Sequence, residues 1–166
     1  HLVIRRQRQM CIRDSSGLVN QNSRYFLQIQ NGCDHRCTFC VIPYGRGNSR
    51  SVSVNKILDN VNEALQNNFK EIVLTGVDLT SWGKEFLGEE YSLGFLVKKI
   101  LNEFKTLPRL RVSSIDPAEI DYELMEVLEN DHRLMPHLHL SIQHGDDLIL
   151  KRMKRRHLYR DVINLV

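Results

Sequence analysis

Residues 25–40 read Tyr25-Phe26-Leu27-Gln28-Ile29-Gln30-Asn31-Gly32-Cys33-Asp34-His35-Arg36-Cys37-Thr38-Phe39-Cys40. The first six are mostly aromatic or apolar and are followed by an Asn-Gly pair, which is the pattern of a short strand that ends in a turn. Three cysteines come directly after it, with the spacing Cys-x3-Cys-x2-Cys. Three thiolates this close together can surround one corner of a metal centre. The stretch therefore predicts a strand that runs directly into a metal-binding loop.

The kind of metal centre depends on the number of ligands. A structural zinc ion takes four protein ligands, whereas this loop offers three cysteines and His35, which lies between Cys33 and Cys37. Iron–sulfur clusters are usually held by four thiolates, so three thiolates on a 4Fe–4S cluster leave one iron open for a substrate. Three interpretations are open at this point: a catalytic iron–sulfur cluster, a zinc site with its fourth ligand elsewhere, or cysteines that only pack in the core.

Strand and helix patterns alternate along the chain. Strands are predicted at residues 25–30, 72–75, 109–115 and 137–143, and helices at 57–69, 93–104 and 116–128 and from Asp146 onward. Four such units with long crossovers predict an α/β fold with a parallel sheet. A closed barrel of eight units takes ~250 residues, so the chain forms either a small open sheet or part of a barrel. In both, ligands bind at the carboxyl ends of the strands, where the cysteine loop begins.

The third helix has the most complete start signal. Asp116 is predicted as its N-cap, with Pro117 at the first helical position and Glu119 at the third. Ile115 and Ile120 occupy the two positions of a hydrophobic staple around this start. The helix is therefore predicted to begin at Pro117.

The composition is that of an ordinary globular domain. The chain has 166 residues, of which 42% are hydrophobic and 26% charged, and its formal net charge is only +3. That charge is too small to indicate a nucleic-acid partner by itself. No apolar run reaches the ~18 residues of a membrane span, and no signal peptide is visible. Four cysteines without a secretory context predict a cytoplasmic protein.

Residues 1–23 are predicted to lie outside the folded domain. Their segment 5–15 has neither a helix nor a strand period and resembles translated sequencing-adapter read-through; the alternative is a short basic arm that binds RNA. Cys11 lies in this segment and is not counted as a ligand. Residues 24–166 form the predicted core domain. Its last helix is still running at Val166, so we expect the chain to be part of a longer protein.

The cysteine spacing after the first strand of an α/β fold resembles the radical S-adenosylmethionine (radical SAM) superfamily. The residues from Gln30 to Gly47, with Ser49-Arg50-Ser51, are similar to those of its methylthiotransferases. Further stretches resemble one branch, whose enzymes act on threonylcarbamoyladenosine in tRNA: Leu74-Thr75-Gly76-Val77-Asp78-Leu79-Thr80-Ser81-Trp82-Gly83, Ser113-Ser114-Ile115-Asp116-Pro117, Pro136-His137-Leu138-His139-Leu140-Ser141 and Met153-Lys154-Arg155-Arg156-His157. The resemblance spans residues 24–166 and implies a partial (β/α) barrel with about four units.

This resemblance implies a transferase that adds a methylthio group to threonylcarbamoyladenosine at position 37 of tRNA. Its implied cofactors are a 4Fe–4S cluster and S-adenosylmethionine, and its implied partners are tRNA and an electron donor such as flavodoxin or ferredoxin. Radical chemistry is needed because an aryl C–H has no acidic proton for a general base. Two alternatives stay open within the family, another tRNA adenosine or a ribosomal-protein aspartate, and a non-catalytic zinc module stays open outside it.

The cluster ligands implied by the resemblance are Cys33, Cys37 and Cys40. Relatives in the family hold a second cluster on an N-terminal domain and carry a small C-terminal β-barrel, neither of which is present in this sequence. The second cluster is where the family handles the inserted sulfur. The chain alone is therefore expected to cleave S-adenosylmethionine without completing methylthiolation.

Further residues are candidates to bind S-adenosylmethionine. The superfamily often carries Gly-Gly-Glu after the second strand, where this chain has Thr75-Gly76-Val77-Asp78. Gly76 would allow close backbone approach and Asp78 would meet the substrate's ammonium; the alternative is an ordinary turn. Phe39 is a candidate to pack on the adenine or to anchor the loop. Ser114 and Gln143, at the ends of the third and fourth strands, are candidate ribose or carboxylate contacts.

A run of positive charge lies near the C-terminus. Residues 151–157 read Lys151-Arg152-Met153-Lys154-Arg155-Arg156-His157, with five cations predicted to surround the fourth helix. Together with the resemblance, the run favours contact with RNA phosphates over a merely solvated helix surface. Arg46 and Arg50, beside the cysteine loop, are further candidates to meet the RNA or a substrate carboxylate.

Overall fold

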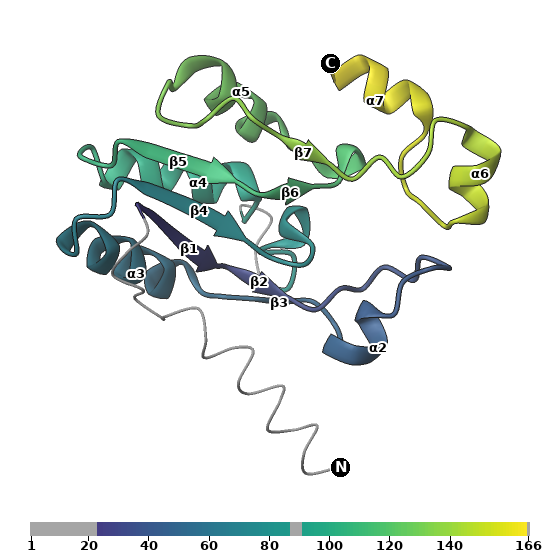
Figure 1. Ribbon diagram of the computed structural model, residues 1–166, viewed down its shortest axis with the longest axis horizontal. Coiled ribbons are helices and arrows are strands. Elements are labelled where there is room, and N and C mark those ends of the chain that lie inside the picture. Colours follow the sequence, from purple (N-terminus) through teal and green to yellow (C-terminus); the bar gives the residue numbers. More distant parts are fainter. Residues whose placement is uncertain (1–22, 87–90, 166) are drawn as a thin grey trace, which may run out of the picture.

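The computed structural model describes residues 23–86 and 91–165, so the predictions made for residues 1–22, Cys11 included, lie outside the described residues (Figure 1). The α/β fold is confirmed. A parallel sheet in the order β1-β4-β5 is formed by β1 (Arg24–Gln28), β4 (Glu71–Thr75) and β5 (Arg109–Val112), and β6 (Ser114–Ile115) pairs in parallel with β7 (His139–Leu140). Only Ser113 separates β5 from β6, so the parallel arrangement continues from β1 to β7 as a partial barrel wall.

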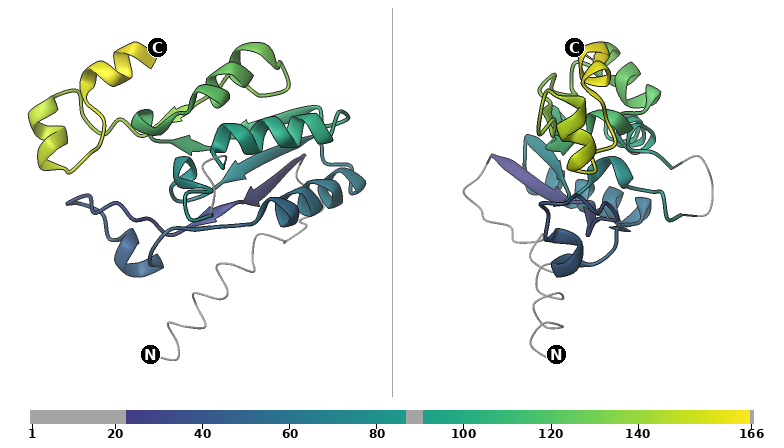
Figure 2. Two further views of the ribbon diagram at one scale, coloured as in Figure 1. Left: turned by 180° about the vertical axis from the view of Figure 1, so that it is seen from behind. Right: turned by 90° about the vertical axis from the view of Figure 1, so that its right-hand side faces the viewer.

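Helices cover one face of this sheet. α3 (Val54–Gln66) and α4 (Leu93–Glu103) lie side by side on it, and α5 (Tyr122–Asn130) packs on α4 (Figure 2). Each helix presents an apolar stripe, which in α3 consists of Ile57, Val61 and Ala64. These stripes bury the central strand β4. None of the helices in the described residues is long and apolar enough to cross a membrane.

The remaining elements are short and lie mostly at the carboxyl end of the sheet. They are β2 (Gln30–Asn31), α2 (Ile42–Arg46), β3 (Arg50–Ser51), the 3-10 turns η2 (Leu79–Ser81) and η3 (Pro117–Glu119), α6 (Asp147–Arg152) and α7 (Tyr159–Leu165). β2 and β3 pair antiparallel and close the base of the cysteine loop. This loop therefore begins and ends on the same small ribbon.

The core is a single apolar layer between the sheet and the helices. Ile72 and Leu74 of β4 are fully buried in it, as is Trp82 after η2. Burying one such aliphatic side chain stabilises the fold by roughly 1.5–3 kcal/mol. The indole Nε1 of Trp82 donates a hydrogen bond of 3.0 Å to the carbonyl of Val52. This bond ties the segment after β4 to the residue that follows β3, the strand that closes the cysteine loop.

The third helix differs from its prediction. Asp116 does accept a hydrogen bond from the backbone N–H of Ala118, but the turn it caps is η3 and ends at once, because Ile120 is extended. The helix α5 begins at Tyr122 instead, with Asp121 as its N-cap. Asp121 also accepts from the N–H of Gly94, the first turn of α4. The observed helix start therefore coincides with a contact to another helix.

Other element boundaries also differ from the predictions. The strand predicted at 25–30 is broken at Ile29, the one at 109–115 is broken at Ser113, and the one at 137–143 shrinks to β7. The loop predicted after the first strand contains the short helix α2. The fourth helix does begin after Asp146, which caps α6, but α6 ends at Arg152. Most of the basic run therefore lies in a turn rather than around a helix.

Candidate active site

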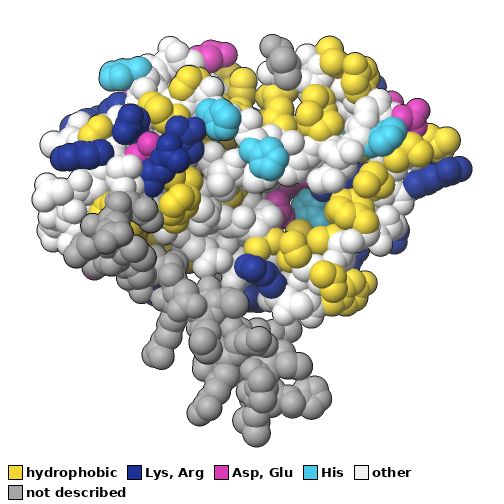
Figure 3. All heavy atoms as spheres, viewed as in Figure 1, with side chains coloured by type: hydrophobic (Ala, Val, Ile, Leu, Met, Phe, Trp, Pro, Cys, Tyr) yellow, Lys and Arg dark blue, Asp and Glu magenta, His cyan; other side chains and the backbone are white. Residues whose placement is uncertain are grey.

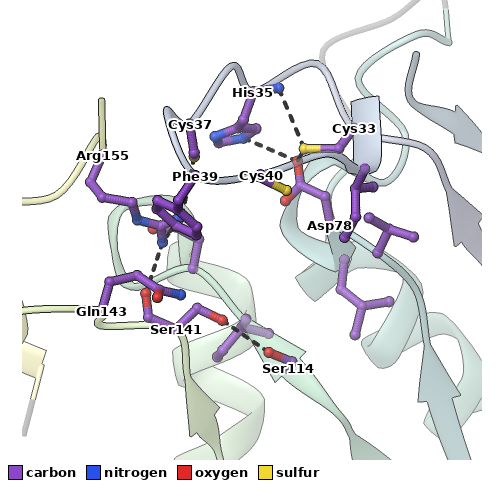
Figure 4. Close-up of a pocket in the computed structure, with 15 residues that line it drawn as sticks. Cys33, His35, Cys37, Phe39, Cys40, Asp78, Ser114, Ser141, Gln143 and Arg155 are labelled. Atoms are coloured by element: carbon purple, nitrogen blue, oxygen red, sulfur yellow. Dashed lines mark hydrogen bonds and ion pairs between the residues drawn. The ribbon is translucent and has the colours of Figure 1, made fainter. Parts of the chain in front are cut away.

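The carboxyl ends of the parallel strands border a cavity of about 220 Å³. Figure 3 shows a hollow at this end of the molecule, with acidic and histidine side chains inside and hydrophobic side chains on its rim. Of the eight residues predicted to hold the cluster or S-adenosylmethionine, seven line the cavity, as Figure 4 shows: Cys33, Cys37, Phe39, Cys40, Asp78, Ser114 and Gln143. The structure thus brings together residues from four separate segments of the chain.

The backbone of the cysteine loop is held by contacts at its base. Gly32 has a φ of +77°, in the left-handed region that favours glycine. The N–H of Cys33 donates a hydrogen bond of 3.1 Å to the carbonyl of Gly47, on the returning limb of the loop. The N–H of Cys40 donates to the carbonyl of Cys37 at 3.1 Å. These contacts curl the loop so that all three thiols line one cavity.

Gly76 is the predicted residue that does not line the cavity. A Cβ on it would lie 3.1 Å from Oε1 of Gln30, a fully buried side chain. That oxygen accepts hydrogen bonds from the N–H groups of Val77 and Asp78, at 3.0 and 2.8 Å. The amide of Gln30 donates to the carbonyl of Gly32 at 2.9 Å. Gly76 therefore makes room for a glutamine that fixes the loop after β4 to the cysteine loop.

Asp78 is buried at the centre of a polar cluster. Its carboxylate lies 3.0 Å from Nε2 of His35 and accepts a 2.7 Å hydrogen bond from the hydroxyl of Ser81. Burial by itself raises the pKa of the Asp78 carboxyl, but the contacts with His35 and Ser81 outweigh it and lower that pKa to about 2. Asp78 is therefore an anion at neutral pH, directed into the cavity.

Cys33 lies next to this anion. Its Sγ is 3.7 Å from Oδ2 of Asp78, and the backbone N–H of His35 donates to Sγ at 3.4 Å. Burial raises the pKa of the Cys33 thiol to about 11, and the negative charge of Asp78 adds to this rise. Cys33 is therefore a neutral thiol when nothing cationic is bound. A metal ion that binds there has to displace its proton.

The other predicted ligand contacts lie around the opening of the cavity. The ring of Phe39 is 52% exposed, so a planar group can reach its face. The hydroxyl of Ser114 lies 3.0 Å from that of Ser141, across the β6–β7 pair. Gln143 is exposed and has a φ of +68°, which turns the chain away after β7. Ser114 and Gln143 face the cysteines from the opposite wall, whereas Phe39 belongs to the cysteine loop itself.

The donor set distinguishes a cluster from a single zinc ion. Zinc–thiolate bonds of about 2.3 Å in a tetrahedral site put the sulfur atoms roughly 4 Å apart. In the described residues the three cysteine sulfur atoms do not form so compact a group; the group within 4.8 Å is Cys33, His35 and Asp78. The three thiols surround a cavity rather than a point, which suits a group of several metal atoms.

Arg155 also lines the cavity, and its buried Nε has no hydrogen-bond partner in the described part of the chain. This unpartnered N–H favours an anionic ligand.

A comparison with protein families matches residues 27–166 to the Radical SAM superfamily. The chain belongs to the radical SAM superfamily. The family predicted from the cysteine spacing is thereby confirmed, and the cavity lies at the strand ends where an α/β barrel of this kind binds its ligands.

Similar curated proteins include methylthiotransferases. The chain is 51% identical over 141 residues to the threonylcarbamoyladenosine tRNA methylthiotransferase MtaB of Rickettsia prowazekii (strain Madrid E). This alignment covers 85% of the present chain and 33% of the relative. The chain is 39% identical over 152 residues to the MtaB of Aquifex aeolicus (strain VF5), covering 90% and 36%. This radical SAM chain therefore spans about a third of the length of the curated relatives it matches.

Solved structures show the same fold. The radical S-adenosylmethionine methyltransferase TsrM from Kitasatospora setae, described with cobalamin and a [4Fe-4S] cluster bound, aligns with a TM-score of 0.64 at 15% identity, over 82% of this chain and 27% of TsrM. A second TsrM structure, described with tryptophan substrate and a SAM analogue, aligns with a TM-score of 0.68 at 14% identity, over 88% and 28%. The partial radical SAM barrel is thus the fold of this chain.

Sequence reasoning missed three residues that the structure places at or beside this cavity. Arg155 and Asp116 line the cavity and form an ion pair of 2.6 Å, and the ring of His157 is fully buried beside them, 3.4 Å from Asp116. From the sequence, Asp116 is a predicted helix cap and Arg155 and His157 belong to a basic run; all three also lie in stretches that resemble the family, but none is predicted to contact the site. A polar residue in a capping or charged pattern carries no local signal that it faces a cavity.

Proposed function

We propose that this chain is the S-adenosylmethionine-cleaving core of a radical SAM methylthiotransferase that acts on threonylcarbamoyladenosine at position 37 of tRNA. The observation that carries the proposal is the convergence of three free cysteine thiols on one cavity at the carboxyl end of the parallel sheet. The names of the Rickettsia and Aquifex relatives supply the substrate class. The TsrM structures, described with a [4Fe-4S] cluster and with a SAM analogue, support the two cofactors.

In this proposal Cys33, Cys37 and Cys40 hold a 4Fe–4S cluster and leave one iron free. When bound, this cofactor supplies the electron that cleaves S-adenosylmethionine to a radical able to take hydrogen from an aryl C–H. The chain contributes the loop that fixes the three thiolates and the cavity that they line. The electron comes from a donor such as flavodoxin or ferredoxin, and the cytoplasm keeps the thiols reduced.

Side chains from both walls of the cavity position S-adenosylmethionine. Asp78 is the anion that meets the substrate's ammonium, because it is buried, charged at neutral pH and 3.7 Å from Cys33. Phe39 offers a half-exposed ring to the adenine. Ser114 and Gln143 donate to or accept from the ribose or carboxylate across the opening. Gly76 acts behind them, through Gln30.

Anaerobic reconstitution tests this function directly. The purified chain, given ferrous iron, sulfide, S-adenosylmethionine and a low-potential reductant, is expected to bind about four iron and four sulfide per chain and to form 5′-deoxyadenosine. Metal analysis and chromatography measure both. One bound zinc without sulfide, held for example by Cys33, His35 and Asp78, would instead support the non-catalytic zinc module. The proposed substrate would be refuted if the longer protein that we expect to contain this chain methylthiolated a ribosomal protein and not tRNA that carries threonylcarbamoyladenosine.

Part of the basic run forms a surface suited to the tRNA backbone. Lys151, Arg152 and Lys154, here called the basic rim, are exposed and make no ion pair with the described residues. The backbone N–H of Thr38 donates to the carbonyl of Met153 at 3.2 Å, which holds the rim beside the cysteine loop. Exposed cations next to the cavity opening would bind phosphates while the modified base enters.

Neutralising the basic rim is expected to weaken tRNA binding. In the variant Lys151→Gln/Arg152→Gln/Lys154→Gln, the slope of log affinity against log salt should fall by about 2, since each lost phosphate contact removes about 0.7–0.9. Fluorescence anisotropy with an anticodon stem-loop at several salt concentrations measures this slope.

A matched control removes the same charge elsewhere. Lys56, Lys70 and Lys105 are exposed and lie on or after the helices of the outer layer. The variant Lys56→Gln/Lys70→Gln/Lys105→Gln should keep the wild-type salt slope. An equal loss in both triple variants would show that only net charge matters and that the basic rim is not the RNA surface.

A further inference from the structure

One cation of the basic run has a different environment from its neighbours. The side chain of Arg155 is 8% exposed, whereas that of Arg156 is 48% exposed and pairs with Glu119. α6 ends at Arg152, and Lys154 has a φ of +57°, so the backbone reverses between them. This reversal turns Arg155 toward the cavity, where Figure 4 shows it between the cysteine loop and the segment after β7.

The guanidinium of Arg155 joins three parts of the site. Its Nη2 donates hydrogen bonds of 2.6 Å to Oδ2 of Asp116 and of 2.8 Å to the carbonyl of Ser141. Its Nη1 lies 3.7 Å from Sγ of Cys37 and donates to it. Arginine stays protonated at all ordinary pH values. A permanent positive charge therefore contacts one of the three thiols that line the cavity.

The charges around the cavity are unequal. Cys37 is next to the guanidinium of Arg155, whereas Cys33 is next to the carboxylate of Asp78. Asp116 compensates the buried guanidinium, and the ring of His157 lies on its other oxygen. A buried cation needs such a partner. The other terminal nitrogen of the guanidinium, Nη1, is directed at the sulfur of Cys37 and not at Asp116.

We infer that Arg155 sets the reduction potential of the cluster, as a positioning residue that acts through the thiolate of Cys37. The inference rests on the proposed function, because it requires Cys37 to be a cluster ligand. Reduction adds one electron, and hence one negative charge, to the cluster. A hydrogen bond and a positive charge on a ligand sulfur stabilise the reduced form more than the oxidised form, which raises the potential.

The two members of the ion pair should act in opposite directions. Replacing Arg155 with methionine removes the hydrogen bond and leaves Asp116 as an uncompensated anion, and both changes lower the potential. Replacing Asp116 with asparagine removes the anion and raises the potential. Arg155→Lys keeps the charge and its pairing with Asp116, but one ammonium cannot copy the fork that reaches Asp116 and Cys37 together. Its potential should lie between those of Arg155→Met and the wild type.

The test is a potentiometric titration of the reconstituted chain. Dithionite and redox mediators supply the electron, and the spin signal of the reduced cluster reports the ratio of reduced to oxidised form. At the wild-type midpoint, Arg155→Met should lower this ratio by about tenfold, which corresponds to about 59 mV for one electron. Arg160→Met is the control, since Arg160 is 77% exposed and pairs only with Asp161 among the described residues. It should leave the midpoint unchanged.

The outcomes separate this inference from the function on which it rests. A wild-type chain that takes up no iron and sulfide refutes the proposed function, and the inference with it. A wild-type chain that holds the cluster, with variants whose midpoints equal its own, refutes the inference alone. Should Arg155→Met not fold, as judged by circular dichroism, the shifts of Arg155→Lys and Asp116→Asn decide, because a merely structural role would not move the potential in opposite directions.

Discussion

Replacement of Cys37 by alanine is expected to abolish formation of 5′-deoxyadenosine by the reconstituted chain. Cys37 is buried and lines the cavity together with Cys33 and Cys40. Two remaining thiolates cannot hold a cluster that already has one iron without a protein ligand. Iron and labile sulfide should therefore fall to background together with cleavage. The fold should persist, because alanine leaves a small apolar side chain at a site that faces the cavity.

The fourth cysteine of the chain is the matched control for this variant. Cys11 lies outside the Cys-x3-Cys-x2-Cys motif, so Cys11→Ala should keep the wild-type iron content and product yield. Colorimetric iron and sulfide assays and chromatography of the products measure both variants. Cleavage retained by Cys37→Ala would contradict the cluster assignment.

Gly32→Ala should disable the site without touching a ligand. Gly32 has a φ of +77°, and a Cβ on it would overlap the carbonyl oxygen of Asn48, on the returning limb of the cysteine loop. The left-handed conformation alone costs a non-glycine residue roughly 1–2 kcal/mol, and the overlap requires the loop to move. Because Cys33 follows directly, we expect most of the bound iron and most of the cleavage activity to be lost.

A second glycine of the same loop tests whether position matters. Gly45 lies in α2, and a Cβ on it would meet nothing within 4 Å. Gly45→Ala should therefore keep the cluster and, since alanine favours helix, should not destabilise the protein. Thermal unfolding and iron content measure both variants. Equal iron content in Gly32→Ala and Gly45→Ala would show that the loop does not depend on the conformation of Gly32.

Local sequence patterns predicted the elements of the fold well and their boundaries poorly. Alternating strand and helix periods gave β1, β4, β5 and the three helices that cover the sheet. The start of α5 was wrong because Asp116 had the better local capping pattern. Asp121 caps the helix in the structure, where it also binds the N–H of Gly94 on α4. Glu119, predicted at the third position of that helix, pairs instead with Lys84 at 2.9 Å. Both partners are remote in the sequence, so a local pattern could not contain them.

For the candidate site, too, local patterns predicted one part of the arrangement and missed another. Of the eight residues predicted to hold the cluster or S-adenosylmethionine, seven line one cavity, because strand ends on one edge of a parallel sheet must meet. Gly76 does not line it; the close approach expected of it is made by Gln30. The basic run is divided, with the basic rim exposed and Arg155 buried at the cavity. Charge alone could not separate these two groups.

By itself, the sequence determined the family and located the cysteine loop, since the spacing of three cysteines within eight residues is a local property that needs no partner. It also determined which edge of the sheet carries the site, since the loop follows the first strand directly. Only the tertiary structure decided which charges face the three thiols. Asp78 meets Cys33 and Arg155 meets Cys37 across 45 and 118 residues of chain. Such contacts arise from the packing of β4 and of the turn after α6 against the loop, which no pattern within the loop encodes.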